Sequence, residues 1–349
     1  MDKMDAMEVA SNGGLLAGLT SFLSSSFGRK SEDQFCQPAR VVCYYPNWAA
    51  HRGTEGKFTV ADIDSSLCTH IIYSFVVLHP DKLVIISDDP QLDLELGNFQ
   101  NFTALKRTNP GVKYMVALGG WADSQDPKYS RLLASSVHMD TFVAHAVQFL
   151  QEFGFDGLDL DYEYPGYDGH GHDAPDSDRP GLVQLCRKLR AAFRPHGWEL
   201  TAAVAAPTSI VDTAYDIPQL SQLLDAVHLM AYDMHGSWES ATNHHAALHG
   251  SAWDKLTAEA AAAHWVAKGC PAYKLVVGIP TYGRSWTLAS WASHQGVEAP
   301  AVGAGQAGPI TKAGGYLAYS EICQFIQNQG WTVLQDPTNH IGPIGKYPF

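Results

Sequence analysis

Short apolar runs alternate with longer amphipathic segments along most of the chain. The runs are rich in Val, Ile, Leu, Ala and Tyr, and many of them end at Gly, Pro or Asp, as buried strands do. Strands are therefore predicted at 40–45, 69–76, 113–118, 157–162, 199–205, 226–232 and 274–280.

The segments between these runs repeat apolar residues at helical spacing. One segment places Phe142, Ala146, Val147, Leu150 and Phe153 on a single face. A second does the same with Leu182, Leu185, Cys186, Leu189 and Phe193, starting near Asp178 and stopping at Gly197. The Ala-rich segment 257–268 is a further predicted helix. Amphipathic helices of this kind cover one face of a sheet.

Strand and helix alternation predicts an α/β fold with a parallel sheet and crossover helices. No nucleotide-binding glycine fingerprint is present, which favours a TIM (β/α)8-type barrel over an open doubly wound sheet. After Arg284 the pattern changes to Gly/Pro turns, short aromatic runs and one helix at 319–329, which predicts an α+β insertion domain after the seventh strand. The eighth strand and helix are expected to be missing.

We therefore predict three regions: an N-terminal linker or disordered segment at 1–34, a barrel catalytic domain at 35–284 and a partial insertion domain at 285–349. The chain of 349 residues is long enough to bury a large core, and 46% of it is hydrophobic. The net charge of −13 and the lack of any Lys/Arg run argue against a nucleic-acid partner. No apolar stretch is long enough to span a membrane.

The compartment is predicted from cysteines and a sequon. The N-terminus is acidic before a short apolar stretch, so no cleavable signal peptide is evident. Cys43 and Cys68 stand at the starts of two successive predicted strands, and a disulfide between them is plausible. Asn101-Phe102-Thr103 is a glycosylation sequon. Together these features favour an extracellular protein, which we expect to be a monomer.

The chemistry-bearing segment is the predicted fourth strand. Alternate strand residues share a face, so Asp159, Asp161 and Glu163 point together, whereas Leu160 and Tyr162 point away. Asp156 has the opposite parity and is interpreted as structural. Carboxylates crowded inside a barrel raise one another's pKa, so one of them keeps a proton at neutral pH.

Glu163 is nearest the barrel mouth, where a protonated carboxylic acid suits glycosidic-bond cleavage. Two alternatives are a solvated acidic strand end and a divalent-metal cluster. The strict alternation of acids with apolar residues disfavours the first, and the absence of a turn glycine with polar intervening residues disfavours a calcium loop. We expect no metal and no cofactor.

The segment 156–163 matches the D-x-x-D-x-D-x-E signature of glycoside hydrolase family 18, and the sequence resembles an arthropod-type chitinase over roughly 35–343. Five further segments resemble the family's strand motifs in the same order: 43–48, 73–75, 117–121, 230–238 and 278–284. Tyr162 departs from the family's usual Trp. The family's eighth strand carries a Trp that forms the floor of the −1 site, and its absence implies a C-terminally truncated chain.

The resemblance implies a retaining, substrate-assisted mechanism in which the sugar's own N-acetyl oxygen attacks the anomeric carbon and forms an oxazolinium ion. Glu163 would be the acid that protonates the leaving oxygen and later activates water. Asp161 would hold the acetamido N–H and share a proton with Asp159. Tyr232 would orient the acetamido oxygen.

The implied substrate is chitin or N-acetyl-chitooligosaccharides, cleaved within the chain. Sugar rings present apolar faces, so aromatic residues at the strand ends are candidate substrate contacts. The full candidate binding set is Tyr45, Trp48, Phe75, Gly119, Gly120, Trp121, Tyr164, Met230, Asp233, Trp238, Tyr282 and Arg284. A chitin-binding lectin without hydrolytic activity and an inactive fragment are the alternatives, although Glu163, which such lectins usually lack, is present.

Overall fold

The computed structural model describes residues 39–53, 55–167, 169, 175–250, 254–335 and 344–346. The predicted linker at 1–34 lies outside the described residues. No helix in the described part of the chain is both long and apolar enough to cross a membrane.

All seven predicted parallel strands are present. They are β1 (Val42–Pro46), β2 (His70–Leu78), β4 (Lys113–Gly119), β5 (Gly157–Asp161), β6 (Glu199–Val204), β7 (Ala226–Leu229) and β8 (Leu275–Val277). They pair in the order β1-β2-β4-β5-β6-β7-β8, and the short β3 (Ile85–Ser87) adds antiparallel to β2. The pattern of apolar runs did not predict β3.

Burial differs between the middle and the edges of this sheet. Every residue of β5 is buried, whereas all three residues of β8 are half-buried. No pairing between β8 and β1 occurs among the described residues, so the sheet is a parallel half-barrel. The described residues contain no eighth parallel strand, and the truncation of the barrel stays a prediction.

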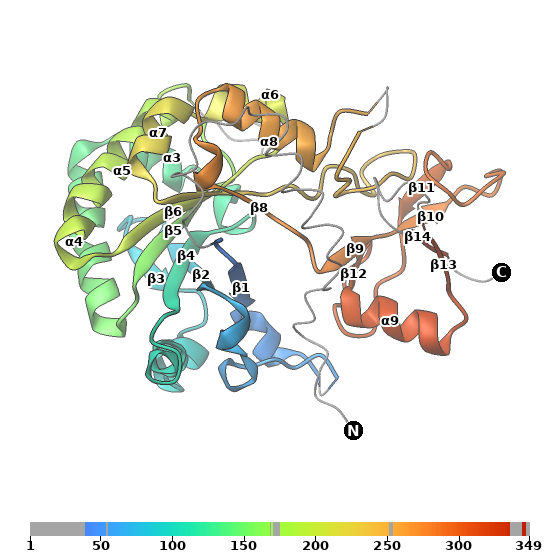
Figure 1. The fold of residues 1–349 in the computed structure, drawn as a ribbon, viewed down its shortest axis with the longest axis horizontal. Helices are drawn as coiled ribbons and strands as arrows, with labels where there is room; N and C mark the ends of the chain where they lie inside the picture. The colour runs from blue at the N-terminus through green and yellow to red at the C-terminus, as the bar shows by residue number, and fades with distance from the viewer. Residues whose placement is uncertain are drawn as a thin grey trace.

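Helices cover the outer face of the sheet (Figure 1). They are α2 (Asn98–Ala104), α3 (Lys128–Leu133), α4 (Ser136–Phe153), α5 (Asp178–Phe193), α6 (Thr208–Ala214), α7 (Ile217–Leu223) and α8 (Ala258–Ala267). The start of α4 is capped by the Ser135 side chain, which accepts a hydrogen bond from the His138 N–H, and its end is closed by Gly154 at φ 72°. Such caps satisfy backbone groups that the helix leaves unpaired.

A second group of short elements follows β8 and forms a lobe beside the sheet (Figure 1). It contains β9 (Tyr282–Arg284), β10 (Trp286–Leu288), β11 (Ala301–Ala304), β12 (Tyr316–Ala318), α9 (Tyr319–Asn328), β13 (Thr332–Leu334) and β14 (Ile344–Lys346). β10 pairs with β11, β9 with β12, and β13 with β14, each pair antiparallel. These are the strands expected of the α+β insertion.

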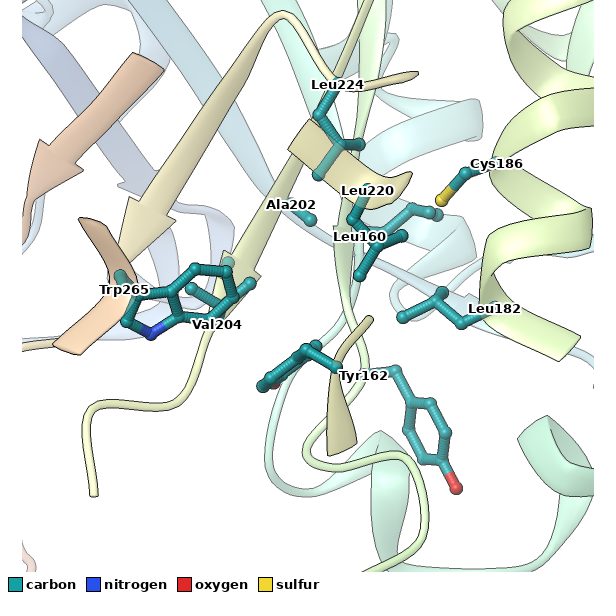
Figure 2. A pocket seen from close by; sticks show the side chains of 11 residues that line it. Leu160, Tyr162, Leu182, Cys186, Ala202, Val204, Leu220, Leu224 and Trp265 are labelled. Carbon is teal, nitrogen blue, oxygen red and sulfur yellow. The ribbon is translucent and has the colours of Figure 1, made fainter. Parts of the chain in front are cut away.

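The main core lies between the outer face of the sheet and its helices. Leu160 and Tyr162 of the β5 segment point into a small apolar pocket there, together with Leu182 and Cys186 of α5 and Trp265 of α8 (Figure 2). A disulfide joins Cys43 in β1 to Cys68 just before β2, as the sequence predicted. It ties together the first two strands of the sheet.

Candidate active site

The alternation along β5 places two acids opposite the helix-covered face. Leu160 and Tyr162 point toward the helices (Figure 2), so Asp159 and Asp161 point to the concave side. Asp159 is 0% exposed and Asp161 is 5% exposed. Glu163 follows two residues after Asp161, beyond the end of the strand, and is half-buried.

Asp159 is held by two hydrogen bonds, one from β6 and one from β1, and by a histidine of β7 nearby. Its Oδ1 accepts a hydrogen bond from the Thr201 hydroxyl of β6 at 2.5 Å, and its Oδ2 accepts one from the Tyr44 hydroxyl of β1 at 2.8 Å. His228 Nδ1 of β7 lies 2.7 Å from the same Tyr44 oxygen and 3.3 Å from Asp159 Oδ1. The carboxylate is therefore fixed in one orientation.

Asp161 has a different environment from Asp159. Its Oδ1 is buried and has no hydrogen-bond partner among the described residues. Burial, followed by the charges of Glu163 and Asp159, raises the pKa of Asp161 well above its usual range. An unpartnered carboxyl oxygen in such a place can accept a hydrogen bond from a bound ligand.

Glu163 is the second acid whose proton affinity is raised. Burial raises the pKa of Glu163 to about 7, against a smaller opposing effect of a hydrogen bond with Tyr164 and with a further increase from the charge of Asp233. A carboxyl group with this pKa is largely protonated in mildly acidic solution. It can therefore donate a proton where an ordinary Glu could not.

Tyr232 and Asp233 follow β7 and face the acids. Burial raises the pKa of Tyr232, and the charges of Asp161 and Glu163 raise it further, so its hydroxyl stays protonated as a donor. Asp233, at φ 55°, forms a two-pronged ion pair with Arg284, in which Nε–Oδ1 and Nη2–Oδ2 are both 2.7 Å. The Arg284 guanidinium also lies 5.4 Å from the centre of the Trp238 ring.

Aromatic rings lie around the same end of the sheet. Trp48 stacks on Phe75 with ring centres 6.0 Å apart, and the Tyr282 ring packs against Tyr232 at 6.2 Å. Trp48 is 49% exposed, Trp121 is 53% exposed and Trp238 is 62% exposed. Large apolar side chains exposed beside an acidic site are typical of a carbohydrate-binding surface.

Most remaining candidates lie near these groups. Tyr164 follows Glu163 directly, and burial, then the Glu163 charge, raises the pKa of its hydroxyl. Met230, at the end of β7, is half-buried, and its N–H donates to the carbonyl of Val204. Gly119 and Gly120 have φ of 120° and 87° and run close to the backbone of Asp161 and the ring of Phe75.

Tyr45 is the exception, because the structure does not bring it to the acids. It is 3% exposed, and its ring packs against Tyr73 and Phe102 on the helix side of the sheet. The adjacent Tyr44 points to the concave side and reaches Asp159. Tyr44 and Tyr45 are adjacent on one strand, and the pattern of residues does not indicate which of them faces the acids. The predicted contact at Tyr45 is therefore wrong in this structure.

Four residues of the site were not predicted from the sequence: Tyr44, Ser124, Thr201 and His228. Strand parity offers a signal for two of them, because Thr201 and His228 are polar residues inside otherwise apolar strands. Thr201 is 42 residues from Asp159, to which it donates a hydrogen bond, and His228 is 184 residues from Tyr44, with which it forms one. Pairings this distant depend on the order of the strands in the sheet.

The fold and the site together define a class of protein. A parallel barrel-type sheet, a row of acids on one strand and exposed aromatic rings at the strand ends are typical of barrel enzymes that act on polysaccharides. The sequence model of the family described as "Glycosyl hydrolases family 18" matches residues 40–344. The chain belongs to this family.

Curated relatives carry chitinase names. The chain is 42% identical over 308 residues to "Probable chitinase 10" of Drosophila melanogaster, an alignment that covers 87% of this chain and 13% of the relative. It is 41% identical over 323 residues to "Endochitinase" of Manduca sexta, covering 89% of this chain and 57% of the relative. The chain thus spans less than two thirds of the length of each of these relatives.

Solved structures resemble the whole described fold. Catalytic domain 2 of the Group II chitinase from Ostrinia furnacalis is 43% identical, with a TM-score of 0.86, and the match covers 89% of this chain and 81% of that chain. Human YKL-39, described as a pseudo-chitinase with retained chitooligosaccharide binding, is 33% identical, with a TM-score of 0.79, and the match covers 89% of this chain and 84% of that chain.

Proposed function

We propose that the protein is a chitinase that cleaves β-1,4 linkages between N-acetylglucosamine units within the chain. The observation that carries this proposal is the pair of acids, the buried Asp161 and the half-buried Glu163, at one end of a barrel-type sheet, both with a raised pKa. Families of this kind that lack a carboxylate nucleophile use the substrate's own N-acetyl group. The proposed reaction is retaining and passes through an oxazolinium ion.

Glu163 acts as general acid and then as general base. Its pKa of about 7 keeps it protonated in mildly acidic solution, where it protonates the leaving glycosidic oxygen. The resulting carboxylate then accepts a proton from the water that opens the oxazolinium ring. Because the acid form is required first, turnover falls as the pH rises through about 7.

Asp161 and Tyr232 position the reacting acetamido group. The buried, unpartnered Oδ1 of Asp161 accepts the acetamido N–H, and the negative charge offsets the positive charge that develops on the ring. The protonated Tyr232 hydroxyl donates to the acetamido oxygen. The charge of Asp159 contributes to the raised pKa of Asp161, and Asp159 is itself held by Tyr44 and Thr201.

The sugar chain binds along the exposed aromatic residues. Trp48 with Phe75, Trp121, and Trp238 with Tyr282 provide flat apolar surfaces for successive sugar rings. Asp233 and Arg284 add polar contacts from a fixed ion pair. Because disulfides persist in oxidising compartments, the Cys43–Cys68 bridge supports secretion of the protein.

The decisive test is release of a fluorophore from an N-acetyl-chitooligosaccharide conjugate. We expect hydrolysis by the wild type and a loss of about 10²–10⁴-fold in Glu163→Gln, which is the contribution of general acid–base catalysis. Glu152→Gln, on the exposed side of α4, is the matched control and is expected to keep wild-type turnover. Equal turnover of wild type and Glu163→Gln would refute the proposal.

Binding without hydrolysis is the second candidate function, favoured by the similarity to the pseudo-chitinase YKL-39. The same experiment separates the two functions when binding of unlabelled oligosaccharide is measured alongside. Tight binding with no fluorophore release by the wild type establishes the binding protein, whereas release that depends on Glu163 establishes the enzyme.

A further inference from the structure

The backbone of Glu163 is held by a side chain rather than by the sheet. β5 ends at Asp161, two residues before Glu163. The Glu163 N–H donates instead to the hydroxyl of Ser124 at 3.0 Å. Ser124 is 0% exposed and lies in the short 3-10 helix Asp123–Gln125, shortly after β4.

This hydrogen bond is one link of a chain that returns to β5. The Ser124 hydroxyl donates to the carbonyl of Gly120 at 3.0 Å, and the Gly120 N–H donates to the carbonyl of Asp161 at 2.8 Å. The loop after β4 therefore holds the backbone on both sides of the acid-bearing turn. A Cβ at Gly119 would lie 2.2 Å from the Asp161 carbonyl oxygen, so this close approach requires glycine.

The same loop is fixed from its other side by Asp123. This carboxylate accepts hydrogen bonds from the Leu78 N–H at 3.1 Å and from the Tyr129 hydroxyl at 2.6 Å, and it pairs with the buried ammonium of Lys128. The loop thus presents Ser124 from a rigid support. Trp121, which is 53% exposed, lies on the same loop.

We propose that Ser124 is a positioning residue for the reaction, because its hydroxyl sets the place of Glu163 relative to the loop that carries Trp121. The inference rests on the proposed function. Without the hydroxyl, the Glu163 N–H loses its acceptor in a buried site, and the turn shifts to find another. A displacement of about 1 Å in a catalytic group can lower turnover about 100-fold.

Turnover and binding are expected to respond differently to Ser124→Ala. We expect kcat on the fluorogenic oligosaccharide to fall about 10- to 100-fold, with KM within about twofold of wild type, since no substrate contact is removed. Burial is the main reason for the raised pKa of Glu163, so a turn that moves toward solvent lowers that pKa. The alkaline limb of the kcat profile is therefore expected to shift to lower pH.

Two variants show whether the hydroxyl is the cause. Ser124→Thr keeps the hydroxyl and is expected to recover most of the lost turnover. Ser87→Ala removes another buried serine hydroxyl, one that donates to Asp93 far from the acids along the chain. It is expected to lower the melting temperature while leaving kcat and the pH profile unchanged.

Full turnover in Ser124→Ala would overturn the inference, and so would an equal loss of kcat in Ser87→Ala. If the alanine variant does not fold, Ser124→Cys tests the inference instead, because cysteine keeps the shape of the serine side chain but is a weaker hydrogen-bond acceptor. A wild-type kcat in Ser124→Cys would also overturn the inference. Absence of hydrolysis by the wild type would instead refute the proposed function and this inference with it.

Discussion

Two glutamates at opposite ends of the parallel sheet have opposite proton affinities. Glu163 lies beyond the carboxyl end of β5, and burial raises its pKa to about 7. Glu199 begins β6 at the other end of the strands, and its pKa is lowered to about 2. Burial acts to raise the pKa in both cases, so the partners account for the difference.

The partners of Glu199 are cationic or donate hydrogen bonds. Arg40 lies 2.7 Å from its Oε2, and His70 Nε2 lies 3.3 Å from the same oxygen. These contacts outweigh the effect of burial on Glu199. Glu163 has Asp161 two residues away and Asp233 across the site, and both are carboxyl groups. The amino end of the strands therefore stabilises the charged form of Glu199, whereas the carboxyl end favours the protonated form of Glu163.

Among the neighbours of Glu163, the largest expected effect comes from removing the carboxylate of Asp161. Asp161→Asn keeps the side-chain shape but loses the charge that offsets the developing positive charge, so we expect turnover of the fluorogenic oligosaccharide to fall about 100- to 1,000-fold. The melting temperature is expected to stay the same or to rise, because a buried acid that ionises at a cost has been removed.

The matched control for that variant is Asp156→Asn. Asp156 belongs to the same signature, but its carboxylate pairs with Lys106 at 2.7 Å and accepts the Tyr114 N–H at 2.9 Å on the other face of the sheet. We expect it to lower the melting temperature and to leave turnover per folded molecule unchanged. The opposite result, with Asp156→Asn inactive and Asp161→Asn active, would show that the face of the sheet that carries Asp156 holds the catalytic acids.

At the other end of the sheet, Glu199→Gln is expected to affect stability instead of chemistry. A pKa lowered from 4.5 to about 2 corresponds to about 3 kcal/mol of folding free energy near neutral pH. The folded-state pKa is depressed, so this contribution is present above pH 4.5 and is lost as the pH falls toward 2. Denaturant unfolding at pH 7 and at low pH measures both values.

The two unfolding curves of Glu199→Gln and wild type should converge at low pH, and turnover at pH 7 should be equal. A stability difference that stays constant down to pH 2 would show that packing, and not the charge of Glu199, holds this end of the sheet. A matched loss of turnover would mean that the two ends of the sheet are not separate in function.

Local patterns accounted for much of the fold. The seven parallel strands and helices α4, α5 and α8 were predicted from apolar runs and helical spacing, because both periodicities are carried by neighbouring residues. The opposite orientations of Asp159 and Leu160 follow from the same alternation. β3 was not predicted, because a strand of three residues is too short to show an alternation of apolar and polar positions.

Contacts between distant residues were not predictable from these patterns. Arg40 and Glu199 are 159 residues apart, and the Ser124–Glu163 hydrogen bond joins residues 39 apart. Either pair meets only because of the order of strands in the sheet and the path of a loop. The sequence therefore indicated which acids gather on β5, but not which neutral side chains hold them.

The smallest expected effect sharpens the comparison on the side of Glu163. The charge of Asp233 adds to the raised pKa of Glu163, so Asp233→Asn lowers that pKa, and the uncompensated Arg284 lowers it further. We expect the alkaline limb of the kcat profile to move to lower pH by about 0.3–0.5 units, a modest coupling for partly screened charges.

Asp140→Asn, on an exposed position of α4, is the control and is expected to leave the limb in place. Because Asp233 is also a candidate substrate contact, KM can rise while the direction of the shift stays diagnostic. If the alkaline limb moves to higher pH instead, the charge of Asp233 does not raise the pKa of Glu163. The two glutamates would then differ, because neighbouring charges set the pKa of Glu199 but not that of Glu163.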